Sequence, residues 1–269
     1  MRGWDLASES SSHDISYDGL ESWHVVLDTS AVFKDYTLTR PEITHLLTRT
    51  LRPTYQICLP AIVVQEIVNH YREDLEAANR RLGTALDSIA KLVQRPIGAA
   101  LTVAQVEFEV HAFQVRFIQL LGQHGVRIEA VPAALAGVEM LVARDLGRRK
   151  PFSDQRSTGR EEGGMRDRSG MRDAIIWESV LALCQREPRS SIFVSKNTRD
   201  FADSSTTELH QDLRSDLEDL GIDGLKVQFY ASIESFMDAH LTSTASENYA
   251  AEPEAFSTSV SDNDERLGE

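Results

Sequence analysis

Val25-Val26-Leu27-Asp28-Thr29-Ser30 is a short, β-branched apolar run that stops abruptly at a carboxylate. Val and other β-branched residues are enriched in strands, so we expect a strand at 25–27 that ends at Asp28. Because the run is short and is followed at once by polar residues, the chain is expected to turn directly after it.

Outward from this run, short apolar strands alternate with stretches of helical periodicity. Further strands are expected at 57–59, 127–131, 192–195 and 225–230. Helices are expected at 40–51, 61–92, 103–121, 133–146, 173–186, 208–220 and 232–241. This alternation predicts an α/β fold, a three-layer α/β/α sandwich with a mainly parallel central sheet and long helical additions.

The two ends of the chain differ in composition from its centre. Residues 1–22 are rich in Ser and Asp, and residues 242–269 in Ser, Glu and Asp, so both are expected to be disordered and acidic. They carry much of the net charge of −14, which therefore does not exclude a nucleic-acid enzyme in the expected domain at 23–241.

The remaining composition indicates a cytoplasmic protein that is not bound to a membrane. No stretch approaches the ~18 apolar residues that span a bilayer, and the N-terminus lacks the apolar run of a signal peptide. Cys58 and Cys184 are the two cysteines, and we interpret them as buried thiols in a reducing compartment.

Four acidic residues fall where the chain turns at one edge of the expected sheet. Asp28 ends the first strand, Glu66 lies in the first turns of the helix after the second, and Asp200 follows the strand at 192–195. Asp173 is expected to begin a helix that runs opposite to the next strand, so it starts at the same edge, where a helix N-terminus favours a carboxylate. Ligands of open α/β sheets bind beyond the carboxyl ends of the strands.

Each of these acids alone has a simpler explanation, as a turn residue, a solvated helix residue, a helix cap or a loop acid. Together they are expected to converge, and carboxylates at close range repel one another unless a cation is present. Mg²⁺ and Mn²⁺ prefer oxygen ligands, and no histidines are paired at zinc spacing. We therefore predict a Mg²⁺ or Mn²⁺ site, with one or two ions, that activates water for attack at phosphorus.

The segment 147–172 is longer than a routine connection in a compact domain. It holds eight Arg and Lys against four acidic residues, although the chain as a whole is acidic. Because Arg is suited to phosphate recognition, we expect a basic loop that contacts the substrate backbone rather than a merely solvated loop. The residues expected to do so are Arg148, Arg149, Lys150 and Arg172.

A local duplication within this loop offers two candidate acids. Gly-Met-Arg-Asp occurs at 164–167 and again at 170–173. Asp173 runs directly into an apolar helix that packing can hold rigid, whereas Asp167 is followed by Arg-Ser-Gly. We therefore expect Asp173 to be the functional copy.

Four short motifs follow one another along the chain. They are Val-Val-Leu-Asp-Thr-Ser at 25–30, Leu-Pro-Ala-Ile-Val-Val-Gln-Glu at 59–66, Arg-Asp-Ala-Ile-Ile-Trp-Glu-Ser at 172–179 and Phe-Val-Ser-Lys-Asn-Thr-Arg-Asp-Phe at 193–201. Taken in this order, they resemble the successive motifs of PIN-domain ribonucleases. The resemblance extends over residues 23–241. It is greatest to a bacterial PIN-like branch of unassigned function and more distant to the ribonucleases of toxin–antitoxin pairs.

The resemblance implies roles for two sets of residues. Asp28, Glu66, Asp173 and Asp200 would be metal ligands or their close supports. Thr29, Ser195 and Asn197 would be their hydrogen-bonding neighbours. It further implies an endoribonuclease that cuts single-stranded or looped RNA and leaves a 5′-phosphate and a 3′-hydroxyl. An antitoxin-like protein partner, a homodimer and cleavage of DNA are left open.

Two other functions compete with this interpretation. A catalytically inactive PIN scaffold could bind RNA or a protein, but a scaffold has no need of four acids. An aspartyl phosphatase of the haloacid dehalogenase type also begins with an aspartate after its first strand. Those enzymes resemble Asp-x-Asp there, whereas Ser30 stands at the second position.

Overall fold

A parallel sheet lies at the centre of the part of the chain that the structure describes. The computed structural model describes residues 22–49, 54–132, 138–152, 169–187, 189–203 and 208–240. Within them, five parallel strands are ordered β3-β2-β1-β4-β5. The strands are β1 (Trp23–Leu27), β2 (Tyr55–Pro60), β3 (Arg127–Glu129), β4 (Ser190–Val194) and β5 (Val227–Tyr230). The expected α/β class with a parallel sheet is confirmed.

Helices make the connections between the strands, as parallel pairing requires. They are α1 (Thr29–Val32), α2 (Pro41–Arg49), α3 (Ala61–Val93), α4 (Val103–Gln123), α5 (Val138–Leu146), α6 (Ser169–Arg186), α7 (Thr198–Phe201), α8 (Gln211–Asp219) and α9 (Ile233–His240). A 3-10 turn, η2 (Gly224–Lys226), leads into β5, so the strand expected at 225–230 is shorter than its apolar run. None of the helices in these described ranges is long and apolar enough to cross a membrane.

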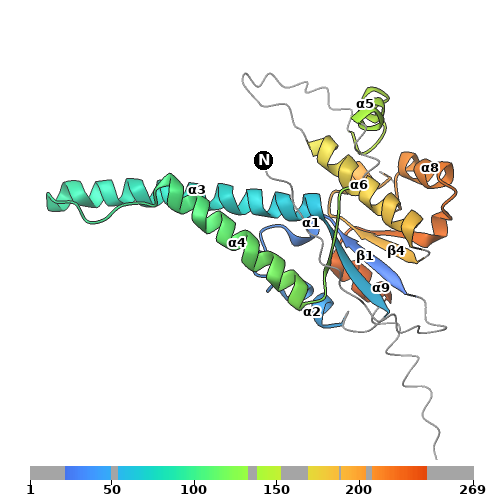
Figure 1. Ribbon diagram of the computed structural model, residues 1–269, viewed down its shortest axis with the longest axis horizontal. Helices are drawn as coiled ribbons and strands as arrows, with labels where there is room; N and C mark the ends of the chain where they lie inside the picture. The colour runs from blue at the N-terminus through green and yellow to red at the C-terminus, as the bar shows by residue number, and fades with distance from the viewer. Residues whose placement is uncertain are drawn as a thin grey trace, which may run out of the picture.

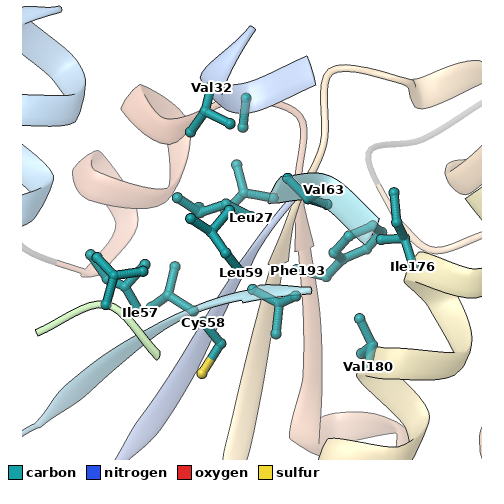
Figure 2. Close-up of a cluster of buried hydrophobic side chains, with 14 of the residues drawn as sticks. Leu27, Val32, Ile57, Cys58, Leu59, Val63, Ile176, Val180 and Phe193 are labelled. Carbon is teal, nitrogen blue, oxygen red and sulfur yellow. The ribbon is translucent and has the colours of Figure 1, made fainter. Parts of the chain in front are cut away.

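The two faces of the sheet are covered by different helices, because successive strand residues point to opposite faces. Phe193 of β4 pairs with Phe229 of β5, and its ring lies 6.2 Å from that of Trp177 on α6. Tyr230 is next in β5 and points the other way, toward Phe236 of α9. Figure 2 shows part of the core between these layers, where Phe193 lies close to Ile176 of α6.

Helices α3 and α4 form an arm that extends from the body of the molecule (Figure 1). At the base of the arm, Tyr71 of α3 stacks on Phe113 of α4, with ring centroids 3.9 Å apart. Farther out, the side chain of Asn79 hydrogen-bonds both the N–H and the C=O of Leu101, at 2.8 Å each. The long helical additions expected from the sequence are therefore one projecting unit.

The start of α6 differs from the expectation. The helix begins at Ser169, so Asp173 lies one turn inside it, and the predicted stabilisation of Asp173 by a helix N-terminus is wrong. Gly170 disfavours a helix locally, which is why the sequence pattern places the start too late. In the fold Gly170 lies against Phe152, and a Cβ at this position would come within 2.8 Å of the Phe152 ring. Position 170 therefore has no room for a side chain unless Phe152 shifts.

Several segments discussed above lie outside the described residues. They are residues 1–21 of the acidic arm expected at 1–22, residues 153–168 of the expected basic loop with Asp167, and the whole acidic tail expected at 242–269. Residues 133–137, at the start of the helix expected at 133–146, lie outside as well. The described part of the basic loop is therefore 147–152 and 169–172.

Candidate active site at the carboxyl edge of the sheet

The site lies where the order of the strands reverses. From β1 the chain builds β2 and β3 on one side and then returns to place β4 and β5 on the other. The ends of β1 and β4 are joined by a hydrogen bond from the N–H of Asp28 to the C=O of Val194, at 3.0 Å. Such a switch point leaves a crevice beyond the strand ends, which is the usual place for a ligand in this class of fold.

Asp28 is buried at this edge of the sheet and is held by three neutral donors. Its Oδ1 accepts the backbone N–H of Thr29 at 2.6 Å. Its Oδ2 accepts the hydroxyls of Ser30 at 2.6 Å and Ser195 at 2.7 Å. Burial raises the pKa of Asp28, although these three hydrogen bonds oppose the shift. The carboxylate is thus fixed in orientation but is not neutralised by a charge.

Glu66 is connected to Asp28 through Thr29. Glu66 lies in the second turn of α3, and its Oε2 accepts the Thr29 hydroxyl at 2.6 Å. Its Oε1 forms an ion pair with Arg172 of α6. Thr29 therefore bridges the first two carboxylates, the neighbouring position that the sequence predicted for it.

Asn197 connects the other two carboxylates. Its Nδ2 donates to Asp173 Oδ2 at 3.2 Å and to Asp200 Oδ2 at 3.1 Å. Its backbone N–H donates to the hydroxyl of Ser195 at 3.0 Å, which in turn donates to Asp28. One chain of hydrogen bonds thus runs from β1 through the loop after β4 to α6.

The four carboxylates are close enough to influence one another. The pKa of Asp173 is raised from 3.8 to about 8, first by burial and then by the negative charges of Asp28, Asp200 and Glu66. Arg172 opposes this shift. Asp173 therefore holds its proton to a higher pH than a solvated aspartate does, and a cation bound beside it would favour the ionised form.

Two of the four carboxylates, Glu66 and Asp200, form ion pairs with basic residues, and we call them the outer carboxylates. Arg172 pairs with Glu66, and Lys150 Nζ lies 3.4 Å from Asp200 Oδ1. Among the described residues, neither Asp28 nor Asp173 has a basic side chain within ion-pair distance. The inner pair of carboxylates is consequently the uncompensated part of the cluster.

The donor set fits a hard divalent cation, although no ligand cage is already formed. Within the described ranges, no three His, Cys, Asp or Glu side chains are grouped as a metal site. Glu66 and Asp200 are turned toward Arg172 and Lys150, which hold them in ion pairs. Asp28 and Asp173 supply oxygen donors of the kind that Mg²⁺ and Mn²⁺ prefer, and they are the residues that would hold the ion.

The predicted basic contacts separate in the structure. Lys150 and Arg172 lie at the carboxylates, but Arg149 Nη2 pairs with Asp216 Oδ1 at 2.9 Å, away from them. Arg148 is exposed and has a left-handed backbone, with φ of 51°. Trp177 is fully buried, so it is a core residue and is not available for stacking on a base.

Sequence reasoning missed two contributions to the site. Ser30 accepts the N–H of Lys196 at 2.9 Å and donates to Asp28, so it joins β1 to the loop after β4. Its place in the first motif was the available signal. The second contribution is the buried ion pair of Arg144 and Asp216, in which Arg144 also donates to the C=O of Lys150. No local pattern identifies this pair, because the two residues come from distant segments.

Comparison with known proteins agrees with this geometry. A family model described as a PIN domain matches residues 25–201, a range that includes all four carboxylates and their hydrogen-bonding neighbours. No curated protein matches the chain.

Proposed function

Because the chain belongs to the PIN-domain family, we propose that it is an endoribonuclease that depends on Mg²⁺ or Mn²⁺. PIN domains are generally nucleases and typically use divalent metals. The observation that carries the proposal is the linkage of four carboxylates at one edge of the sheet. Thr29 joins Asp28 to Glu66, and Asn197 joins Asp173 to Asp200. A site built in this way favours binding of a cation over a stable empty state.

The residues of the cluster have separate tasks in this proposal. Three hydrogen bonds fix the orientation of the Asp28 carboxylate. Asn197 sets the spacing of Asp173 and Asp200 by donating to both. A bound Mg²⁺ or Mn²⁺ supplies activation of the attacking water and neutralisation of charge at the phosphoryl group.

The proposed substrate is single-stranded or looped RNA, whose backbone can bend into the crevice. Lys150 and Arg172 stand beside the carboxylates and offer cations to the phosphate oxygens. Contacts of this kind supply affinity without sequence specificity. The products are proposed to carry a 5′-phosphate and a 3′-hydroxyl, because water attacks the phosphorus and the 3′ oxygen leaves.

The direct test is cleavage of an end-labelled RNA by the full chain with Mg²⁺, with Mn²⁺ and with excess chelator. Cleavage is expected with either metal and is expected to stop in chelator. Asp28→Asn should abolish it, while circular dichroism shows an intact or more stable fold because a buried charge is removed. Full activity of Asp28→Asn, or of the wild type in chelator, would contradict the mechanism.

The same assay separates the competing functions. A small phosphate ester tests for a phosphatase, and a single-stranded DNA of the same sequence tests the choice of nucleic acid. A scaffold would bind the RNA and leave it intact under every metal condition. Mn²⁺ binding, measured by titration calorimetry on the wild type and on Asp28→Asn, tests the metal site without relying on turnover.

A further inference from the structure

The basic run Arg148-Arg149-Lys150 does not behave as one cluster. Arg149 is held by Asp216, away from the carboxylates. Lys150 instead directs its ammonium group at the loop after β4, where Nζ donates to the C=O of Arg199 at 2.9 Å and lies 3.4 Å from Asp200 Oδ1. Two adjacent basic residues therefore serve different purposes.

The main chain of Lys150 is anchored on both sides. Its N–H donates to Asp212 Oδ2 of α8 at 2.9 Å, and its C=O accepts a hydrogen bond from Arg144 of α5. Arg144 is buried and pairs with Asp216, whose Oδ2 also accepts the indole N–H of Trp177 at 2.8 Å. The position of Lys150 is thus tied to the core through a buried network.

The ammonium group of Lys150 is held by hydrogen bonds and is also partly accessible to solvent. The C=O of Arg199 is a neutral acceptor, so this contact does not depend on the charge state of the carboxylates. The side chain of Lys150 is 21% exposed, against 42% for Arg172. Less motion is therefore left to Lys150 than to Arg172, while part of its side chain remains accessible to a ligand.

We propose that Lys150 is the fixed cation that contacts the reacting phosphate on the Asp200 side of the site. Asp212 and the pair of Arg144 and Asp216 are its positioning residues. The proposal rests on the proposed nuclease function and adds to it. Arg149, in contrast, has a structural role and makes no contact with the substrate.

A compact ammonium held in advance at the site stabilises charge that develops on the phosphoryl oxygens. It need not reorganise when the substrate arrives, because its main chain and its ammonium are already anchored. Lys acts as a point charge toward phosphate, so the effect should depend on position more than on the planar geometry that an Arg provides.

The test compares Lys150→Met with Arg149→Met, two neighbouring substitutions that remove the same charge. Rates are measured with Mg²⁺ on a short single-stranded RNA, and kcat and KM are determined separately. Lys150→Met is expected to lower kcat by about a hundredfold, the usual loss when one preorganised electrostatic contact is removed. Arg149→Met should leave kcat nearly unchanged, provided that the assay temperature is below the melting temperature of this variant. Lys150→Arg should restore only part of the rate.

A second measurement excludes a general loss of the site. Mn²⁺ binding without RNA, followed by titration calorimetry, should be equal or tighter in Lys150→Met, because a positive charge beside Asp200 is removed. Loss of metal binding together with activity would mean that Lys150 merely supports the carboxylates, and it would overturn the proposal.

The positioning role is tested with Asp212→Ala, because the Asp212 side chain is partly exposed and accepts the N–H of Lys150. The buried pair of Arg144 and Asp216 is left in place. This variant should lower kcat, and the double variant with Lys150→Met should be no slower than Lys150→Met alone. Additive losses would overturn the positioning role. If the kcat of Lys150→Met equals that of the wild type, the proposed role of Lys150 is overturned, although the proposed nuclease function is not. A wild-type protein that cleaves no RNA would overturn both.

Discussion

Helix α3 has two ends that could hardly differ more in their surroundings. Near its start, Val63, Val64 and Ile67 are buried against the sheet, and Glu66 projects into the candidate site. Near its far end, Leu82, Ile89 and Leu92 are exposed, and Leu92 is 84% accessible. One continuous helix therefore provides both a part of the core and an arm that stands in solvent (Figure 1).

The contrast shows that helical periodicity does not tell how deeply a segment is buried. The start of α3 meets strands and helices from distant parts of the chain. From its middle outward it meets the segment that returns directly after it, beginning with the contact between Asn79 and Leu101. Contacts of short sequence separation form easily and cost little loop entropy. The site should therefore be sensitive to single changes, and the arm should tolerate them.

The largest expected effect is on turnover, from Asp173→Asn compared with Asp167→Asn. Both residues follow Gly-Met-Arg, so the two variants share their local sequence. Asp173 lies within the carboxylate cluster, and its loss should lower RNA cleavage by orders of magnitude, as measured under single-turnover conditions. Asp167→Asn should change the rate of cleavage little. An inactive Asp167→Asn variant together with an active Asp173→Asn variant would show that Asp167, and not Asp173, is the functional acid.

The next largest effect is on stability, from Ile67→Ala compared with Ile89→Ala on the same helix. Ile67 is 2% exposed and Ile89 is 44% exposed. The free energy of unfolding should fall by about 2–5 kcal/mol for Ile67→Ala, because a buried cavity is created. For Ile89→Ala the change should stay within about 0.5 kcal/mol. Urea denaturation measures both, and equal losses would show that the arm is packed as firmly as the body.

A smaller effect is expected on the pH dependence of stability. In the folded protein the pKa of Asp173 is raised from 3.8 to about 8. Between these values the unfolded chain has lost this proton while the folded chain keeps it, so wild-type stability falls as pH rises. Below about pH 4 and above about pH 8 this contribution no longer changes.

Asp173→Asn cannot titrate, so it isolates this contribution. In chelator, the melting temperature of the variant minus that of the wild type should grow from about pH 5 to about pH 8 and then level off. The same difference for Asp167→Asn provides the comparison. A constant difference for Asp173→Asn would mean that the folded protein does not perturb this carboxyl group.

The smallest expected effect comes from shortening the arm. Residues 80–100 can be replaced by a short Gly-Ser linker, since Asn79 and Leu101 are already in hydrogen-bond contact. The melting temperature should change little, because the removed segment contributes few buried side chains. A large decrease would show that the distal arm supports the core.

Much of the fold follows from local pattern. The runs ending at Leu27 and Val194 are apolar and short, so their strand character and their polar termini are visible without a structure. Helix ends were harder to predict, and α6 shows why. Its first turn contains Gly170, which disfavours a helix locally but is packed against Phe152, a residue from another segment.

The same division holds for the site. That Asp28, Glu66, Asp173 and Asp200 gather at one edge follows from parallel topology, since strand ends and the starts of the following helices share that edge. Which cation contacts which acid does not follow from topology. Arg172 and Glu66 are 106 residues apart, and Lys150 and Asp200 are 50 apart.

The sequence by itself determined the α/β class, the parallel sheet and the set of acids, because periodicity and the direction of each element decide these features. Only the tertiary structure decided that Arg149 turns to Asp216 while Lys150 turns to Asp200, and that Asp173 lies inside its helix. The physical reason is that ion pairs and helix starts are selected by packing between distant segments, where adjacent residues with the same charge meet different partners.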